Sequence, residues 1–438
     1  MKQLTGMDAS FLYMESETQF GHVSGLSIFA RPDDSSYDPY TAWRARLQER
    51  LPLLEPLRRR LVEVPLGLDH PFWADDPHFD IEYHVRHELL PTGTDDELTS
   101  LVGDIIARPL DRSHPLWESY VIEGLSGERF AVLTKVHHAA VDGGAGVELL
   151  TLMLDDVLTV EAPAAERARQ AWRPDQLPTS AEVMTQAALS LVRKPGRALL
   201  LSTRLVRDVG RATRNPVIVS AARQLRSGLR GPVGAVLNRG RDRELDPEPI
   251  GPLPQAAPAT PFNGPISPHR SVALGSVPLS TVKAIKTALG ATVNDVVLAV
   301  CAGGLRSWLE RHDALPDGPL VVVVPVSLRT DDDPDRWTNR VSITVASLPT
   351  DEPDPETRVK RVHESMTTAK QLFEAVPAEA LTDFTQFPPP AVFALAMRAA
   401  ASMSRRYRPA VNLTVSNVPG PRQPLYAAGA QLLHYYPV

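Results

Sequence analysis

The chain has 438 residues, of which 43% are hydrophobic and 22% charged, a composition typical of globular proteins. This length exceeds what one hydrophobic core usually organises, so we expect two domains. The net charge of −6 argues against a general nucleic-acid-binding protein. The single cysteine, Cys301, excludes an intrachain disulfide, and its apolar neighbours predict a packed core residue and not a thiol nucleophile.

The sequence carries no pattern typical of targeting or membrane insertion. Residues 1–8 lack the basic stretch followed by an apolar one that a secretory signal requires. No apolar run reaches the roughly 18 residues of a membrane span. We therefore expect a cytoplasmic protein, which leaves open a peripheral association with the inner membrane or with lipid bodies.

The first 61 residues predict a short helix or turn, a strand and a longer helix. Residues 6–13 form the helix or turn, and residues 22–29 alternate in polarity as a strand does. His22 in that strand is expected to be a hydrogen-bonded structural residue and not a ligand. Residues 43–61 carry apolar side chains at helical spacing and end in three arginines, 58–60, which we expect on a solvated face.

A Pro-Leu-Trp motif precedes the predicted strand of residues 120–125. It consists of Pro115, Leu116 and Trp117. We expect this motif to wedge the sheet against a helix, and a direct contact with substrate is the alternative.

The stretch with the most chemical content follows the predicted strand of residues 129–136. His137 and His138 come first, and Asp142 and Gly143 open a tight turn into a helix. Because adjacent strand side chains point to opposite faces, one histidine is expected to pack and the other to face an opening. Imidazole titrates near neutral pH, so the pattern suits proton transfer, with the carboxylate fixing the loop or the tautomer. A purely structural role for the two histidines is the alternative.

Other chemistries fit the sequence less well. A Gly-x-Ser-x-Gly elbow is absent from the sequence, which argues against an α/β-hydrolase. The glycines at 144 and 146 lack the third glycine and the lysine of a nucleotide loop. We expect no metal site, because His137 and His138 point to opposite faces and the sequence offers no third ligand to join them and Asp142.

Residues 161–260 are rich in proline and arginine and predict a helical connector between domains. Ten Lys and Arg residues lie between positions 193 and 230, with only Asp208 against them. Four of these arginines are spaced to share one helix face, namely Arg204, Arg207, Arg211 and Arg214. This helix is either a solvated linker or an interfacial helix that docks on anionic lipid.

The second half again alternates predicted strands and helices. Thr292 is a plausible N-cap, and Asp295 suits the first turn of the helix that follows, where the helix dipole favours a carboxylate. The expected strands are residues 270–277, 320–326, 339–345 and a strand-and-turn at 412–421. The expected helices are residues 279–289, an apolar helix that begins within residues 291–298, residues 355–373 and residues 392–403.

The His-His-x-x-x-Asp-Gly motif at the end of a strand resembles the active-site motif of the CoA-dependent acyltransferase superfamily. That resemblance implies that His138 is the general base, that His137 supports it and that Asp142 is structural. A narrower resemblance is to the bacterial wax ester synthase/acyl-CoA:diacylglycerol acyltransferases. Its motifs are residues 4–30, 71–86, 110–118 with the Pro-Leu-Trp signature, 262–270, Asn294-Asp295 and 412–421.

The resemblance implies an α/β fold with two chloramphenicol-acetyltransferase-like domains, each a mixed β-sheet covered by helices, and a tunnel between them. The expected division is residues 1–160, a connector at 161–260, and residues 261–438. Asn294 becomes a candidate substrate contact, and Asp295 a structural neighbour. Related sequences continue beyond Val438, so we expect the second domain to lack the family's tail or to be finished differently.

The implied reaction transfers a long-chain acyl group from acyl-CoA to the hydroxyl of diacylglycerol or of a fatty alcohol. Acyl-CoA is a co-substrate, and no cofactor, metal or covalent intermediate is expected. Two alternatives stay open. One is an acyltransferase for polyketide or carrier-bound substrates, and the other is a non-catalytic lipid-binding or lipid-body protein.

Overall fold

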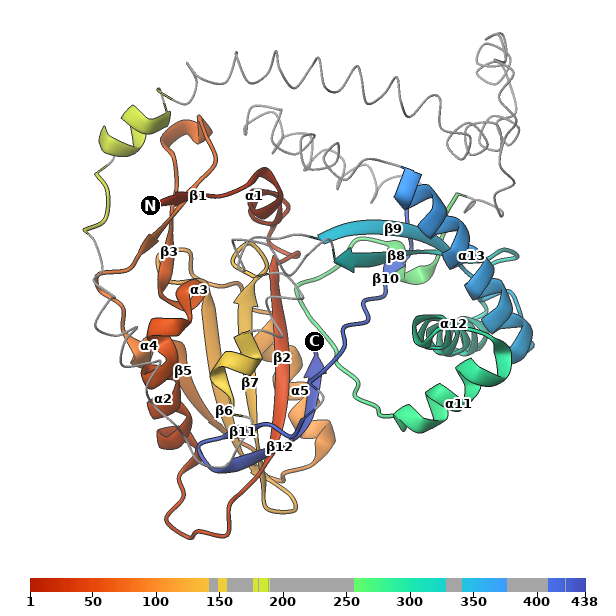
Figure 1. The fold of residues 1–438 in the computed structure, drawn as a ribbon, viewed down its shortest axis with the longest axis horizontal. Coiled ribbons are helices and arrows are strands. Elements are labelled where there is room, and N and C mark those ends of the chain that lie inside the picture. The colour runs from red at the N-terminus through yellow and green to blue at the C-terminus, as the bar shows by residue number, and fades with distance from the viewer. Residues whose placement is uncertain are drawn as a thin grey trace.

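The computed structural model describes residues 1–141, 149–155, 176–179, 181–187, 189, 256–327, 341–375, 409–421 and 423–438. These residues form a first half built on a six-stranded sheet and a second half built on a three-stranded sheet (Figure 1). The histidine motif lies in the first half, at the end of a central strand. The Arg204–Arg214 region and residues 392–403 lie outside the described residues.

The large sheet is mixed and has the strand order β11-β12-β2-β7-β6-β5. β5 and β6 are parallel, and the other pairs are antiparallel. The strands are β2 (His22–Ala30), β5 (Val85–Leu89), β6 (Trp117–Leu125), β7 (Arg129–His137), β11 (Tyr426–Ala427) and β12 (Ala430–Pro437).

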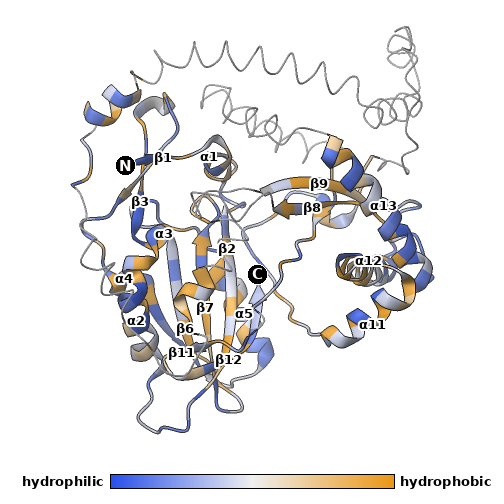
Figure 2. Cartoon of the chain, viewed as in Figure 1, coloured by the Kyte–Doolittle hydropathy of each residue, from blue (hydrophilic) through white to orange (hydrophobic). Residues whose placement is uncertain are grey.

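Helices pack on both faces of this sheet, as the alternation along its strands requires. One face packs Phe29 and Val132 against α2 (Pro39–Arg50), and Trp43 of α2 donates its indole N–H to Ser119 at 2.9 Å. The opposite face packs Leu133 and its neighbours against α5 (Asp95–Ile106). Figure 2 shows hydrophobic colour along β7, at the centre of this arrangement.

Capping residues set where the helices begin. Asp38 accepts a hydrogen bond from the Thr41 N–H at the start of α2, and Thr94 accepts one from the Glu97 N–H at the start of α5. Each cap satisfies an N–H that has no partner within the helix, worth about 1 kcal/mol.

Trp117, the last residue of the Pro-Leu-Trp motif, is buried between the sheet and a short helix. Its indole N–H donates to the Leu57 carbonyl of α3 (Glu55–Arg58) at 2.6 Å. The His84 ring of α4 (Ile81–His84) stacks on it, with ring centroids 4.4 Å apart and planes within 7°. This is the position that a wedge between sheet and helix requires.

Two histidines, the buried His84 and the half-buried His22, make stability depend on pH. Burial lowers the pKa of His84 to about 4, despite the bond between its Nδ1 and the Trp117 carbonyl at 2.8 Å, and burial and the nearby Lys135 charge lower that of His22 to about 4. The unfolded chain takes up these protons near pH 6.5. The contribution of these neutral histidines to the free energy of unfolding is therefore fully present above pH 6.5. It is lost as the pH falls towards 4, by up to about 1.4 kcal/mol per pH unit for each histidine.

We expect His84→Asn to flatten this pH dependence, because asparagine can still donate to the Trp117 carbonyl but does not titrate. The measurement is the melting temperature of the wild type and the variant between pH 7.5 and 4.5. The variant should melt at a lower temperature than the wild type at pH 7.5, since it loses the ring stack on Trp117. The difference between the two melting temperatures should narrow as the pH falls. A gap that stays constant contradicts a neutral buried His84.

A separate three-stranded sheet corrects the expectation for the arginine cluster. Its strands are β1 (Lys2–Gln3), β4 (Phe72–Asp75) and β3 (Arg59–Val62), in the order β1-β4-β3. Arg59 is buried, pairs with Glu55 at 2.7 Å and lies over the Trp73 ring at 5.4 Å. The predicted solvated helix face is wrong here, because the helix ends at Arg58 and the β3–β4 register brings an acid and an aromatic ring to the arginines.

The second half packs helices on a sheet with the strand order β10-β8-β9. Thr292 caps α12 in a reciprocal capping box with Asp295, and Gly290, with φ of 65°, ends α11 in the left-handed conformation that favours glycine. The elements are α11 (Leu279–Leu289), α12 (Val293–Arg311), β8 (Leu320–Ser327), β9 (Val341–Leu348), α13 (Pro355–Ala375) and β10 (Leu413–Thr414). α12 and α13 pack on each other and on β9 (Figure 1).

The last strand of the chain crosses from the second half to the first. β12 pairs antiparallel with β2 from Leu432↔Phe29 to Pro437↔Gly25. A Cβ on Gly25 would lie 2.4 Å from the Tyr435 hydroxyl, so this glycine makes room for the crossing strand. The expected unit of residues 261–438 therefore contributes its final strand to the sheet of the first unit.

Two further expectations for the second half need correction. Residues 270–277 form no strand, since Val272 and Leu274 pack against the first half's core beside α5 and pair with no strand. Cys301 is half-buried and not fully packed, and burial raises the pKa of its thiol. Within the described ranges no single helix is long and apolar enough to cross a membrane; α11 and α12 satisfy length and composition together but are bent by 102°.

Candidate active site

His138 lies directly beyond β7 and is half-buried. Its ring stacks on Phe11 of α1 (Gly6–Tyr13), with centroids 4.1 Å apart and planes within 10°. Its backbone N–H donates to the Gly21 carbonyl at 2.8 Å, just before β2 begins. The ring is thus held on one face by α1, and its backbone is held by the loop between α1 and β2.

His137 is buried, and hydrogen bonds engage both of its ring nitrogens. The Ala139 backbone N–H donates to Nδ1 at 3.0 Å, so Nδ1 carries no proton. The proton is on Nε2, which lies 3.1 Å from Glu15 Oε1 and donates to it. This neutral tautomer leaves His137 no nitrogen with which to accept a proton from a substrate.

Glu15 joins three segments of the chain at this point. Its Oε1 accepts from His137 and from the Gly21 N–H at 2.8 Å, and its Oε2 accepts from Arg112 at 2.6 Å. Burial alone would raise the pKa of Glu15, but its bonds to His137, Arg112 and Gly21 outweigh burial and lower it to about 2. Glu15 therefore carries its charge throughout the physiological range.

Gly21 is required by the closeness of the His137 ring. A Cβ built on Gly21 would lie 2.7 Å from His137 Nε2 and 3.0 Å from the Phe11 carbonyl oxygen. Neither neighbour is the end of a flexible side chain. The backbone at this position therefore admits no side chain without moving the histidine or α1.

We expect Gly21→Ala to lower both the melting temperature and the turnover, because the added methyl group displaces His137 or α1. The loss of stability should be about 1–3 kcal/mol, as for other overpacked sites. Melting curves and initial rates of the two proteins test this, with Gly264→Ala as the control, since a Cβ there meets nothing closer than 4.0 Å. Unchanged melting and turnover in Gly21→Ala would contradict the close approach.

Asp142 and Gly143 lie outside the described residues, so their predicted roles stay predictions. Residues 149–153 beyond them are helical, and their end is tied to α2. Arg46 of α2, which is buried, donates to the Met153 carbonyl at 3.2 Å and pairs with Asp155, which Arg50 also contacts at 2.7 Å. These bonds fix the chain on the far side of the motif's turn.

Asn294 and Asp295 lie in the second half, at the start of α12. Asp295 is buried, closes the capping box with Thr292 and accepts from His363 Nδ1 at 2.8 Å. Asn294 is within 3.4 Å of the Asn417 side-chain amide, so two predicted motifs meet here. No hydrogen bond or ring contact found among the described residues joins Asn294 to His138.

A pocket of about 350 Å³ opens beside Asn294. It lies between the start of α12, the strands β8 and β9, and α13. Its lining is mixed, with apolar Met366 and Phe373 and polar His363 and Lys370. Asn294 therefore lines an open pocket, and its predicted contact with substrate stays a prediction.

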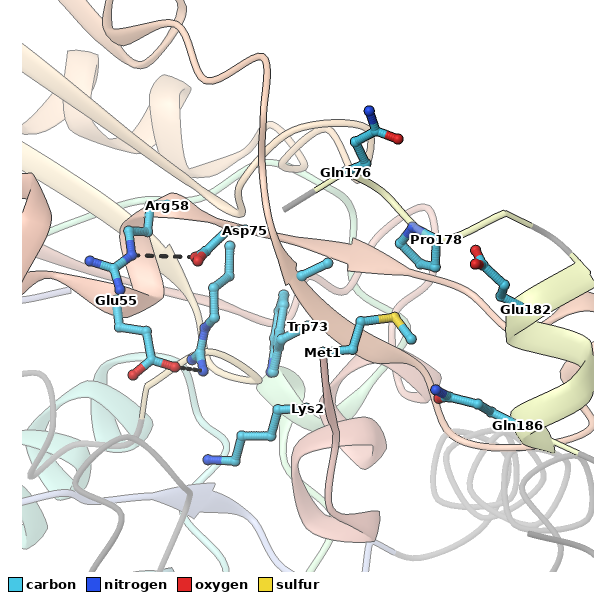
Figure 3. Close-up of a pocket in the computed structure, with 12 residues that line it drawn as sticks. Met1, Lys2, Glu55, Arg58, Trp73, Asp75, Gln176, Pro178, Glu182 and Gln186 are labelled. Atoms are coloured by element: carbon cyan, nitrogen blue, oxygen red, sulfur yellow. Dashed lines mark hydrogen bonds and ion pairs between the residues drawn. The ribbon is translucent and has the colours of Figure 1, made fainter. Parts of the chain in front are cut away.

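A larger cavity of about 530 Å³ lies beside the sheet of β1, β4 and β3 (Figure 3). None of the residues predicted from sequence to do chemistry lines it. Four of its charged groups are paired, Arg59 with Glu55 at 2.7 Å and Arg58 with Asp75 at 3.3 Å, and Trp73 lies beside these pairs. We assign this cavity no role in the chemistry.

Sequence reasoning missed four residues that hold the motif, namely Phe11, Glu15, Gly21 and Arg112. All four lie in stretches that carry the family resemblance, residues 4–30 and 110–118, but the sequence assigned none of them a role. Glu15 and Gly21 lie in the loop between α1 and β2. The one sequence signal for Glu15 and Gly21 is a glycine directly before a predicted strand. In the structure that strand pairs with the motif strand, and His22 lies opposite His137.

Comparison with known proteins relates the whole chain to one family. A model of the wax ester synthase/diacylglycerol acyltransferase catalytic domain matches residues 4–297, and a model of the family's C-terminal domain matches residues 337–438. A Mycobacterium tuberculosis protein named as a candidate diacylglycerol O-acyltransferase is 35% identical over 100% of this chain and 80% of its own length.

Solved structures agree with this relation. The wax ester synthase/diacylglycerol acyltransferase from Marinobacter aquaeolei VT8 has 30% identity and a TM-score of 0.62, and the match covers 100% of this chain and 86% of that one. The first condensation domain of the CDA synthetase has 18% identity and a TM-score of 0.50, over 100% and 84% of the chains, and shows the fold alone. The expected two-domain α/β fold is confirmed, whereas the tunnel stays a prediction, because neither cavity described above includes His138.

Proposed function

Because the chain belongs to the wax ester synthase/diacylglycerol acyltransferase family, and is an acyl-CoA-dependent O-acyltransferase, we propose that it acylates diacylglycerol with His138 as general base. The acyl donor is a long-chain acyl-CoA. The product is a triacylglycerol. A long-chain alcohol is the second candidate acceptor, since the Marinobacter protein is named a wax ester synthase as well as a diacylglycerol acyltransferase.

The observation that carries this proposal is the hydrogen bonding of His137. Both nitrogens of that ring are engaged, one by the Ala139 N–H and one by Glu15. Since this pattern occupies His137, we assign the base to the other imidazole of the motif, that of His138, which is half-buried and stacked on Phe11. This supports the role of general base for His138.

In the proposed reaction His138 removes the proton from the acceptor hydroxyl as that oxygen attacks the thioester carbonyl. The carbon–sulfur bond then breaks, and the proton passes from His138 to the departing thiolate, which gives the ester and free CoA. A thiolate is a good leaving group, so no covalent enzyme intermediate is required. Donors to the developing oxyanion should contribute as much as the base, and Asn294 is our candidate for a polar contact of this kind.

The experiment is to incubate the purified protein with palmitoyl-CoA and either dioleoylglycerol or hexadecanol, and to follow thiol release. The half-buried Cys301 adds at most one thiol per chain to the signal. We expect acceptor-dependent release that is larger with dioleoylglycerol. Release that does not depend on an acceptor, or that occurs only with a carrier-bound acyl donor, would overturn the proposal.

We also propose that the protein associates with lipid surfaces while it acts. The support is the arginine-rich sequence between Arg204 and Arg214, which lies outside the described residues. Flotation with vesicles that contain anionic phospholipid should carry the wild type, and replacement of the four arginines by glutamate should prevent it. Equal flotation of both proteins would discard this part of the proposal.

A further inference from the structure

We propose that Glu15 is a positioning residue for the reaction, and that it holds His138 in place through two separate routes. The inference rests on the proposed function, since it presumes that His138 is the base. Glu15 lies in the loop between α1 and β2, 122 positions before His137 in the chain. Of its three hydrogen-bond donors, Arg112 and His137 come from distant parts of the sequence, and Gly21 lies in the same loop.

The first route runs through His137. Glu15 accepts from Nε2, which sets the tautomer in which Nδ1 accepts the Ala139 N–H at 3.0 Å. The Ala140 N–H donates to the His137 carbonyl at 2.9 Å, so the chain turns immediately after β7. His138 lies inside this turn, and its backbone direction follows from the bonds on either side of it.

The second route runs through Gly21. Glu15 accepts the Gly21 N–H at 2.8 Å, and the Gly21 carbonyl accepts the His138 N–H at 2.8 Å. One peptide segment thus connects the carboxylate to the backbone of the base. The same loop leads back to α1, where Phe11 stacks on the ring of His138.

Arg112 keeps this carboxylate charged and in place. It donates to Glu15 Oε2 at 2.6 Å and to the Leu12 carbonyl at 2.9 Å, so it also ties the end of α1. On its other side it reaches Glu63 at 3.2 Å. Glu63 is more than half exposed, and no contact between it and either histidine occurs in the described part of the chain.

The chemistry of the three donors demands a carboxylate. Glutamine has one acceptor oxygen where glutamate has two. If that oxygen serves His137 and Gly21, the amide NH₂ opposes the Arg112 guanidinium, and if it serves Arg112, the NH₂ opposes the other two N–H groups. Either arrangement sets donor against donor, so Glu15→Gln must move at least one of the segments that position His138.

The test compares the kcat and KM of Glu15→Gln with those of Glu63→Gln, at a temperature below both melting transitions. Glu63→Gln makes the same chemical change beside the same arginine, and it should leave turnover unchanged. Glu15→Gln should lower kcat by about 10- to 100-fold, the scale of a catalytic group misplaced by about 1 Å, with an unchanged KM for palmitoyl-CoA. Glu15→Asp keeps the charge but is one methylene shorter, so its kcat should lie between those of Glu15→Gln and Glu63→Gln.

A double-mutant cycle separates positioning from a general loss of structure. Glu15→Gln should reduce turnover in the wild type but not in His138→Ala, because a residue that acts through the base has no effect once the base is gone. Equal losses in both backgrounds, or full kcat in Glu15→Gln and Glu15→Asp, would overturn the inference. Near-normal turnover in His138→Ala would instead overturn the proposed function, so the two failures are distinct.

Discussion

Replacement of His138 by alanine is expected to lower acyl transfer by about 10²–10⁴-fold, the contribution of a positioned general base. The fold should be retained, because the ring is only half-buried, and the variant loses its stack on Phe11. Such a stack is worth about 0.5–1.5 kcal/mol, a small loss for a chain of this size. Initial rates with palmitoyl-CoA, measured beside a melting curve, test both statements.

The matched control is the neighbouring histidine. His137→Ala removes a buried ring whose two nitrogens are bonded to Ala139 and Glu15, so we expect a clear fall in melting temperature together with a loss of activity. His138→Ala should therefore lower mainly the rate of acyl transfer, whereas His137→Ala should lower both the rate and the melting temperature. If His138→Ala kept near-normal turnover, the general-base mechanism would have to be abandoned.

The second large effect should come from Glu118→Gln, which leaves a buried lysine without its counterion. Lys135 is fully buried on β7, two residues before His137, and its Nζ lies 3.0 Å from Glu118 Oε2 on the adjacent strand. Among the described residues the ammonium group also donates to the carbonyls of Ile105 and Arg108, at 3.4 and 3.0 Å. Removal of one partner of a buried ion pair typically costs about 3–5 kcal/mol.

Urea denaturation of four proteins measures this coupling, namely the wild type, Glu118→Gln, Lys135→Met and the double variant. We expect the double variant to be more stable than Glu118→Gln, because a methionine in the lysine's place leaves no unpaired charge. Burial already lowers the pKa of Lys135, so the single variant should lose less stability at high pH, where the lysine gives up its proton. Additive changes in the cycle would show that the pair is not coupled.

Local patterns were sufficient to predict most elements. Residues 279–289 were expected as a helix and form α11 with these bounds, and the predicted N-cap Thr292 caps α12. The valine-rich run at 320–326 lies within β8. Hydrophobic period and capping chemistry act within a few residues of the chain, so a sequence displays them directly.

Long-range contacts were not predictable in the same way. Residues 270–277 read as a strand, yet they pair with no strand and pack beside α5, and the arginines expected on a solvated face include the buried Arg59. Strand pairing and burial depend on what the rest of the chain brings near. A pattern of alternation cannot reveal whether the partner is another strand or a helix surface.

For the site, the sequence was enough to identify the pair of histidines and, from the alternation of strand side chains, to expect that one of them packs and the other faces an opening. The tertiary structure shows how each ring is held, His137 by Ala139 and Glu15 and His138 by its stack on Phe11. Glu15 and Gly21 meet His137 only because β2 pairs with β7 and brings the loop before β2 to the end of the motif strand. Hydrogen bonds between residues more than a hundred positions apart leave no periodicity in a sequence, since their geometry exists only once the sheet has formed.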